Sequence, residues 1–232
     1  MQKRLVRKLD LEMLLSEVDP HPSPNVDLEQ YTISTSAAAE MLYIAAYVHD
    51  DIVGRTVLDL GCGTGRLALG AAFLGAKHVV GVDIDENAIR VAVQNSVKTD
   101  LKGKVNWVVA DIGVIHGDFD TVVQNPPFGV QKKTADRKFL EKALETGKVV
   151  YSLHKHPTND SLLAQKIRSD GGGFKLVSPS PFLKKFAEKH GSKIRACYAL
   201  LMSIPHMFSF HTKRRHDFVV DLYVMERQVK TS

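Results

Sequence analysis

The sequence has little cysteine and no long hydrophobic run. Only Cys62 and Cys197 occur among its 232 residues, and they form no Cys-x-x-Cys pair, so neither a disulfide framework nor a structural zinc site is indicated. The apolar stretches are interrupted well before the ~20 residues of a membrane-spanning helix. The basic start lacks the apolar core of a signal peptide. We therefore expect no membrane contact, no bound metal and a cytoplasmic location.

Internal repeats and low-complexity tracts are absent too, and the composition is that of an ordinary globular protein. Hydrophobic residues make up 44% and charged residues 25% of the chain. This length suffices for one α/β domain and is short for two, so we predict a single domain over residues 1–232. The net charge of +5 weakly favours an anionic partner, although many basic proteins bind no nucleic acid.

Residues 1–30 are predicted to form an N-terminal extension, a short helix followed by a linker. The apolar positions near helical spacing, which indicate an amphipathic helix, are Leu5, Leu9, Met13 or Leu14, and Leu15. Three prolines between residues 19 and 24 exclude regular structure there. A second helix is expected over 37–49, where serines just before it can cap free N–H groups.

From Thr56 onward, strand and helix patterns alternate, which predicts a parallel sheet with helices on both faces. The expected parallel strands are 55–60, 78–83, 105–110, 119–124 and 147–152. The expected helices are 66–74, 85–98, 136–146, 159–169 and 181–190, with a short strand or a loop before the last one, up to residue 180. Two last strands, 193–203 and 217–225, would give the sheet an antiparallel end. The prediction is thus a Rossmann-like, seven-stranded, mostly parallel sheet.

A glycine-rich turn follows the first strand and points to a nucleoside cofactor. In the stretch Asp59–Gly65, the spacing Gly-x-Gly-x-Gly allows a tight turn and a close approach of the backbone to a ligand at a helix N-terminus. The dinucleotide fingerprint would have glycine where this chain has Arg66, and an acidic residue two positions before the first glycine is typical of S-adenosylmethionine sites. Asp83 ends the second strand about twenty residues on, where a carboxylate can bind both ribose hydroxyls.

The third strand ends at Asp111-Ile112, which offers a second contact to the cofactor's adenine. The carboxylate of Asp111 can accept a hydrogen bond from the exocyclic amine, and Ile112 can pack on the ring. An aspartate that only caps the next turn is the alternative, and the sequence leaves both open.

The fourth strand ends in Asn125-Pro126-Pro127-Phe128, where ligands bind in a parallel sheet. The two prolines carry no N–H, so they end the strand and stiffen the turn. Carbonyl oxygens of Asn125 and Pro126 can each accept one N–H of a planar amine, and Phe128 offers an aromatic face for stacking. A proline turn that merely closes a strand is the plainer interpretation. We predict that these four residues are the catalytic loop.

Together these motifs resemble the class I amino-methylating methyltransferases, in the order cofactor motif first and target motif second. Further stretches narrow the resemblance; they are 28–31, 41–43, 125–129, 150–155, 210–211 and 220–222. They are similar to the methyltransferase-like family that modifies N6 of one adenosine in small-subunit ribosomal RNA. The stretch Tyr151-Ser152-Leu153-His154-Lys155 is more specific than the glycine turn. The resemblance implies an S-adenosylmethionine-dependent rRNA adenine N6-methyltransferase of archaeal or eukaryotic type.

The resemblance also implies which residues bind the cofactor. Carried over by position, the cofactor-binding residues are Gln30, Thr32, Asp59, Gly61, Gly63, Thr64, Asp83, Ile84, Asp111 and Ile112. The chain departs from the family at Thr32-Ile33, where Pro-Thr is usual, so the threonine contact passes to Thr32 or Thr35. Residues 158–181 are longer than the resemblance leads us to expect, which predicts an insertion or a surface loop.

Cations around the catalytic loop are candidates for binding RNA. The predicted RNA-binding residues are Lys132, Lys133, Lys213, Arg214 and Arg215, and a solvated charged turn is the alternative for each cluster. The strand 105–110 is expected at one edge of the sheet. Members of the resembled family often work with a small zinc-binding activator protein, and we predict its docking at this edge; a covered edge is the alternative.

Two rival functions stay open. A protein glutamine N5-methyltransferase shares the Asn-Pro-Pro motif but more often has tyrosine where this chain has Phe128, and the basic clusters also count against it. A non-catalytic RNA-binding protein could keep the same fold, although the intact glycine turn, Asp83 and Asn125 argue against decay. A nicotinamide dehydrogenase is the least supported, because Arg66 replaces the third fingerprint glycine.

Overall fold

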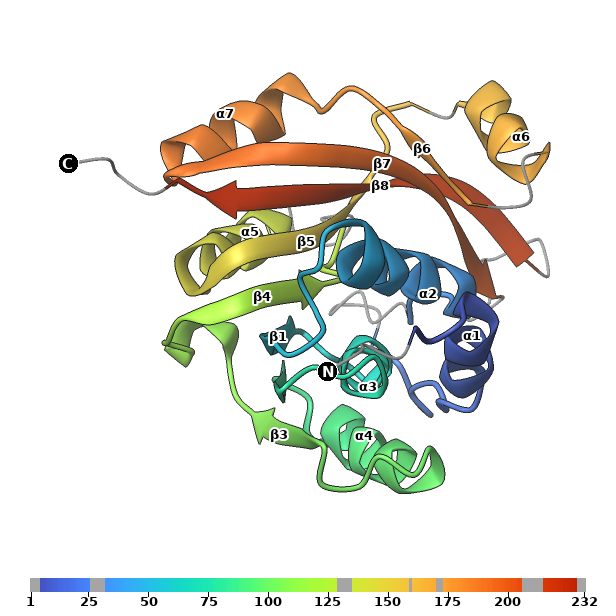
Figure 1. The fold of residues 1–232 in the computed structure, drawn as a ribbon, viewed down its shortest axis with the longest axis vertical. Coiled ribbons are helices and arrows are strands. Elements are labelled where there is room, and N and C mark those ends of the chain that lie inside the picture. The colour runs from blue at the N-terminus through green and yellow to red at the C-terminus, as the bar shows by residue number, and fades with distance from the viewer. Residues whose placement is uncertain are drawn as a thin grey trace.

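A single twisted sheet runs through the molecule in the strand order β3-β2-β1-β4-β5-β8-β7-β6 (Figure 1). The structure is a computed structural model that describes residues 5–25, 32–128, 135–158, 160–169, 173–205 and 215–228. The parallel strands are β1 (Thr56–Leu60), β2 (His78–Asp83), β3 (Val105–Val109), β4 (Phe119–Gln124) and β5 (Gly147–Lys155). The antiparallel strands are β6 (Phe174–Leu176), β7 (Ser192–Pro205) and β8 (Arg215–Arg227).

The predicted mostly parallel architecture is confirmed, but the predicted number of seven strands is wrong, because the sheet has eight. The additional strand is β6, in the stretch before residue 180 for which the sequence left a short strand or a loop open. It is three residues long, too short to show an alternating pattern, and it is held by pairing with β7. Phe174 packs edge-on against Tyr198 of β7 with ring centroids 5.1 Å apart.

Helices cover both faces of the sheet, as predicted. They are α1 (Lys8–Ser16), α2 (Thr35–Tyr43) with its π-helical continuation η2 (Ile44–Val48), α3 (Arg66–Phe73), α4 (Glu86–Lys98), the 3-10 turn η3 (Ile112–Val114), α5 (Ala135–Thr146), α6 (Ser161–Ser169) and α7 (Pro181–Lys189). The apolar side chains of α1, α2 and α3 share a core with one face of the sheet, and those of α5 and α7 share a core with the other. Within the described ranges, no helix is long and apolar enough to cross a membrane.

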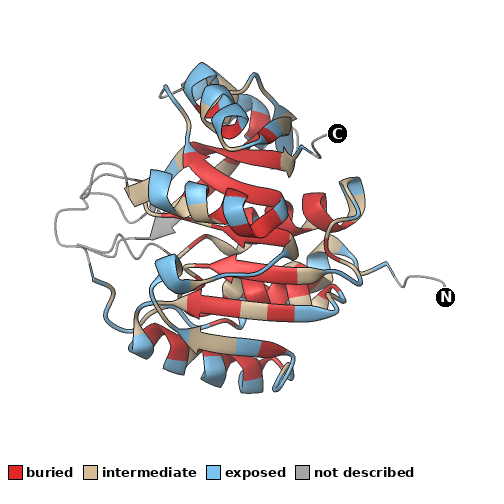
Figure 2. Cartoon of the chain, turned by 90° about the vertical axis from the view of Figure 1, so that its left-hand side faces the viewer, coloured by how far each residue is buried: buried red, intermediate tan, exposed pale blue. Residues whose placement is uncertain are grey.

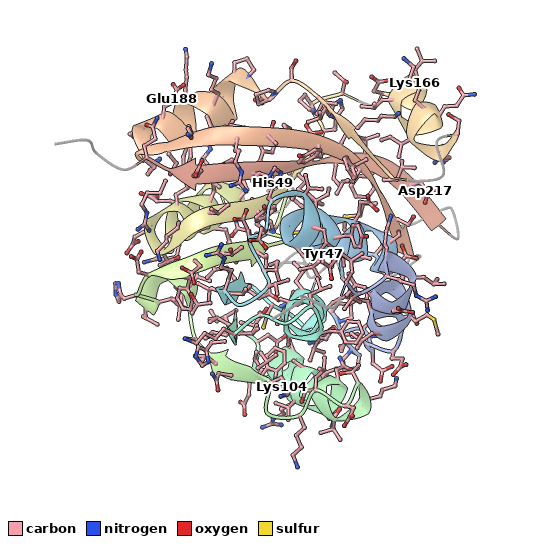
Figure 3. All side chains as sticks on the ribbon, in the orientation of Figure 1. Tyr47, His49, Lys104, Lys166, Glu188 and Asp217 are labelled. Atoms are coloured by element: carbon pink, nitrogen blue, oxygen red, sulfur yellow. The ribbon has the colours of Figure 1, made fainter. Side chains whose placement is uncertain are left out.

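The burial pattern follows from this layering (Figure 2). The central strands are buried between helices whose outer sides are exposed, and β3 at the edge is only partly buried. Charged side chains such as Lys104, Lys166 and Glu188 lie at the surface (Figure 3). Both cysteines are buried and free.

The buried face of α1 differs from the predicted one. Leu5, Leu9 and Met13 are exposed, with 65%, 59% and 60% of their surface accessible. Of the predicted positions only Leu15 is fully buried, and it shares the core of α2 and α3 with Leu11, which was not predicted. Two apolar stripes share the same four-residue spacing, and the sequence does not say which one meets the rest of the protein.

Trp107 on β3 packs directly onto two glycine backbones. A Cβ added to Gly81 of β2 would lie 2.6 Å from the Trp107 ring, and one added to Gly65 would lie 2.5 Å from it. Real Cβ atoms do not approach a ring this closely, so both positions need glycine for packing. The indole thus ties the edge strand to the start of α3.

Gly81→Ala is expected to destabilise the protein by about 1–3 kcal/mol, because the new methyl group must displace the Trp107 ring. Without this contact, alanine in a strand would gain about 0.5–1 kcal/mol over glycine. Urea unfolding followed by the fluorescence of the single tryptophan measures the change. Gly173→Ala is the control, since its nearest neighbour is 3.9 Å away. Equal stability of the two variants would contradict the packing argument.

Candidate active site

A cavity of about 660 Å³ opens where β1, β2 and β4 end. Its wall is built by the glycine turn after β1, the ends of β2, β3 and β4, one side of α5 and the residues before α2. The predicted site residues that line it are Thr32, Asp59, Gly61, Gly63, Thr64, Asp83, Ile84, Asp111, Ile112, Asn125 and Pro127. The structure therefore brings most of the predicted cofactor residues and the first residue of the predicted catalytic loop to one place.

Other predicted site residues lie apart from this cavity or outside the described ranges. Pro126 is buried, and Phe128 faces Phe218 of β8 with ring centroids 6.2 Å apart and planes at 89°. The residues that lie outside the described ranges are Gln30, Lys132, Lys133, Lys213 and Arg214. Arg215 begins β8, and its side chain lies outside what the structure describes.

The three glycines of the turn all have positive φ, at 71° for Gly61, 53° for Gly63 and 90° for Gly65. This left-handed conformation favours glycine. A Cβ on Gly61 would also meet the Phe139 ring at 2.8 Å, whereas one on Gly63 would meet nothing within 4 Å. The backbone at Gly63 is thus bare toward the cavity, as close approach of a ligand requires.

Asp83 at the end of β2 is held by two backbone N–H groups. Its Oδ2 accepts a hydrogen bond from Gly63 at 2.8 Å, and its Oδ1 accepts one from Asp85 at 2.9 Å. Burial raises the pKa of this carboxyl group, and the two backbone hydrogen bonds lower it. A carboxylate has about four acceptor positions, so two remain for the hydroxyls of a ribose.

Asp59 is 1% exposed and presents an unpaired acceptor at the cavity wall. Its Oδ2 accepts from the backbone N–H of Ala68 at 2.9 Å, while its buried Oδ1 has no hydrogen-bond partner in the structure. Burial is the main cause that raises the pKa of Asp59 to about 8, and the nearby Asp83 raises it further. A buried acceptor of this kind fits a positively charged donor, such as the ammonium group of an amino acid cofactor.

Asp111 fits both of the interpretations that the sequence left open. Its Oδ1 accepts from the backbone N–H of Gly113 at 2.7 Å and so caps the turn η3. It also lines the cavity, together with Ile112 and the 56% exposed Ile84. Two apolar side chains and an acceptor therefore surround a place where a flat ring could lie.

A buried polar chain just before the predicted catalytic loop was missed from the sequence. The side-chain amide of Gln124 donates to Ser152 Oγ at 2.9 Å, and Ser152 lies 2.9 Å from His154 Nε2. Burial lowers the pKa of His154 to about 4, so the imidazole is neutral at neutral pH. Gln124 directly precedes Asn125, and Ser152 is its partner across the β4–β5 pairing, so this chain fixes the end of β4.

The contribution of α5 to the cavity was also missed. Its residues along the wall are Ala135, Lys138, Phe139, Glu141, Lys142 and Glu145. Lys142 forms an ion pair with Glu145 at 2.7 Å and donates to the backbone carbonyl of Ile115 at 3.2 Å. The amphipathic pattern predicted the helix, but only the way it packs shows which side faces the cavity.

Asp59→Asn is expected to remove a pH dependence of stability. The pKa of Asp59 is about 8 in the folded protein and 3.8 ordinarily. At a pH between these two values, the folded protein keeps the Asp59 proton, whereas the unfolded chain has released it. Stability of the wild type therefore falls as pH rises through this range, by up to about 1.4 kcal/mol per pH unit from this group. Urea unfolding from pH 5 to pH 8 is the measurement. The exposed Asp118→Asn should keep the wild-type slope, and an unchanged slope in Asp59→Asn would contradict the assignment.

Comparisons with known proteins agree with this geometry. The family called "Methyltransferase small domain" matches residues 38–166. An uncharacterized protein of Methanocaldococcus jannaschii is 37% identical over 96% of this chain and 95% of its own length. The rRNA N(6)-adenosine-methyltransferase METTL5 of Danio rerio is 35% identical over 91% of this chain and 95% of its own length.

The likeness extends to solved structures. The structure superposes with a TM-score of 0.80 on a crystal structure from Pyrococcus horikoshii. That protein is described as an RNA methyltransferase by inference. It is 36% identical and covers 97% of this chain and 100% of its own. The sheet with its antiparallel end is thus the Rossmann-like methyltransferase fold. The chain belongs to the methyltransferase small domain family, and it is a methyltransferase whose methyl donor is S-adenosylmethionine.

Proposed function

We propose that this enzyme methylates N6 of an adenosine in RNA, and specifically of one adenosine in small-subunit ribosomal RNA. The observation that carries the proposal is Asn125-Pro126-Pro127-Phe128 at the end of β4, with Asn125 and Pro127 on the wall of the cofactor cavity. Relatives named METTL5 that span nearly the whole chain support the same substrate class. The net charge of +5 suits a polyanionic substrate.

The cavity suits the cofactor, and we assign its wall residues accordingly. Asp83 is proposed to bind the ribose hydroxyls, and the unpaired Oδ1 of Asp59 the ammonium group of the methionine part. Asp111 and Ile112 are proposed to bind the adenine. Gly61, Gly63 and Thr64 would face the cofactor through the turn, and Gln30 and Thr32 would close it from the N-terminal side.

The catalytic loop is proposed to hold the target amine. The carboxamide oxygen of Asn125 and the backbone carbonyl of Pro126 each accept one N–H of the amine, which directs its lone pair toward the cavity. Bound S-adenosylmethionine supplies a methyl group on a sulfonium, which is reactive toward such a lone pair. The prolines fix the turn, and the Gln124–Ser152–His154 chain fixes the strand behind it.

Phe128 is proposed to stack on the target base after it leaves the RNA helix. Phe218 presses edge-on against Phe128 and so sets the plane of its ring. No side chain has to act as a base, because the amine becomes acidic once methylated and can lose its proton to water. His154 is buried and bonded to Ser152, and its role is therefore positional. The cations predicted to hold the RNA phosphates are Lys132, Lys133, Lys213, Arg214 and Arg215.

Asn125→Ala is expected to lower kcat by about 100-fold or more, because the amine loses the acceptor that orients it. Binding of S-adenosylhomocysteine should stay nearly unchanged, since the cavity walls that are assigned to the cofactor remain. Transfer of labelled methyl from S-adenosylmethionine to ribosomal RNA from cells lacking this protein measures turnover, and calorimetry measures binding. Arg90→Gln, a change on the exposed face of α4, is the control. Parallel loss of turnover and binding would contradict the assigned role.

The product of the same reaction tests the substrate. Nucleoside analysis of the labelled RNA is expected to give N6-methyladenosine with the wild type and none with Asn125→Ala. Label in protein and none in RNA would favour the alternative function, a glutamine N5-methyltransferase. The absence of label everywhere, with intact cofactor binding, would favour a non-catalytic RNA-binding protein or a missing partner.

A small zinc-binding activator protein at β3 is a further part of the proposal. β3 ends the order of strands, and Val109 and Val114 beside it are 49% and 65% exposed. An exposed apolar edge can accept a strand from another chain. Val109→Asp is expected to abolish co-purification of a zinc-containing protein, as measured by gel filtration and metal analysis, and to leave S-adenosylhomocysteine binding intact. Co-purification that survives the substitution would place the partner elsewhere.

A further inference from the structure

Arg66 occupies the position where a dinucleotide-binding loop has its third glycine. Its side chain contacts the N-terminal segment of the chain. Arg66 begins α3 directly after Gly65 and lines the cofactor cavity. One terminal nitrogen of its guanidinium donates to the backbone carbonyl of Ile33, and the other donates to the carbonyl of Val18 at 2.9 Å. A single side chain of the glycine turn therefore holds two distant parts of the N-terminal segment.

The part of the N-terminal segment that lies over the turn, residues 18–25 together with 32–33, is called the strap below. A second anchor comes from α4, where Asn95 is 1% exposed. Its Oδ1 accepts from the N–H of Asp19 at 3.0 Å, and its Nδ2 donates to the carbonyls of Asp19 at 3.1 Å and Thr64 at 3.0 Å. Lys98 adds an ion pair with Asp19 at 2.8 Å. In Figure 1 this part of the chain leaves the end of α1 and reaches α4.

The strap forms part of the cavity wall. His21, Thr32 and Ile33 all line the cavity. His21 Nδ1 accepts from the backbone N–H of Ser23 at 3.1 Å, which leaves the proton of a neutral imidazole on Nε2. Nε2 lies 3.1 Å from a carboxylate oxygen of Asp85, whose own N–H donates to Asp83. The strap thus meets the cavity beside the carboxylate assigned to the ribose.

We propose that Arg66 is a positioning residue that clamps the strap over the cofactor cavity and so slows release of the cofactor. This inference rests on the assignment of the cavity to S-adenosylmethionine. The planar guanidinium reaches both carbonyls at once, which the single ammonium of a lysine cannot do. Burial lowers the pKa of Arg66 to about 10, so the side chain stays charged at neutral pH and its hydrogen bonds remain charge-assisted.

The test measures binding of S-adenosylhomocysteine to the full-length protein by calorimetry, together with steady-state kinetics. Arg66→Gln is expected to raise Kd by about tenfold or more, and Arg66→Lys by less, because lysine keeps the charge and one contact. The KM for S-adenosylmethionine should rise with Kd, while kcat at saturation stays within about twofold. Hydrogen exchange should increase in residues 18–25 and not in the central strands. The control is Arg90→Gln on the exposed face of α4, with unchanged Kd.

The outcomes separate the clamp from the function on which it rests. A folded Arg66→Gln variant with wild-type Kd, or one that loses kcat with unchanged KM, would overturn the clamp alone. If Arg66→Gln does not fold, Arg66→Lys and Lys98→Met decide; Lys98→Met removes an exposed tie to the strap and should raise Kd by about twofold. Wild-type affinity in both would overturn the clamp. Wild-type protein that binds no S-adenosylhomocysteine would overturn the cofactor assignment and the clamp with it.

Discussion

Two carboxylates buried at the ends of neighbouring strands hold the active site together. Asp59 at the end of β1 accepts from the first turn of α3, and Asp83 at the end of β2 accepts from the glycine turn between them. Burial of a carboxylate costs free energy, which the raised pKa values of both groups reflect, and the nearby Asp83 raises the pKa of Asp59 further. The backbone N–H groups of the turn offset part of that cost. The glycine turn therefore keeps its shape because it satisfies these carboxylates, and the cavity depends on that shape.

The sequence was sufficient for features that a local pattern encodes. The valine-rich parallel strands, the glycine turn and the Asn-Pro-Pro-Phe stretch are each readable within a few residues, and the structure places Asp83, Asp111 and Asn125 on one cavity as their strand-end positions predict. Features that depend on a distant partner were not readable. Phe174 of β6 packs on Tyr198 of β7, and Gln124 of β4 donates to Ser152 of β5, in each case a partner far away in the sequence. The contacts of Arg66 with Val18 and Ile33 have no local signal at all.

The same distinction applies to Asn125–Phe128, the loop that we propose to be catalytic. The tetrapeptide supplies the chemical groups, but their positions depend on two other strands. β5 contributes Ser152 and His154, which hold Gln124 just before the loop, and β8 contributes Phe218, which fixes the ring of Phe128. The loop thus lies between the parallel part of the sheet and its antiparallel end. We infer that β8 is part of the target side of the active site, while β1 and β2 form the cofactor side.

The position of the strap and the binding of the cofactor are coupled by thermodynamic linkage. A cofactor that touches the strap binds more tightly when the strap is already in place, and by reciprocity the bound cofactor stabilises the strap. Fixing the strap in place costs conformational entropy. The hydrogen bonds of Arg66 and Asn95 hold the strap before the cofactor binds, so that binding itself carries less of this cost. Weak anchors would give fast exchange and low affinity, and strong anchors would give slow release of the spent cofactor. The buried guanidinium holds one carbonyl at each end of the strap and is therefore a strong anchor, which by this linkage favours tight binding of the cofactor.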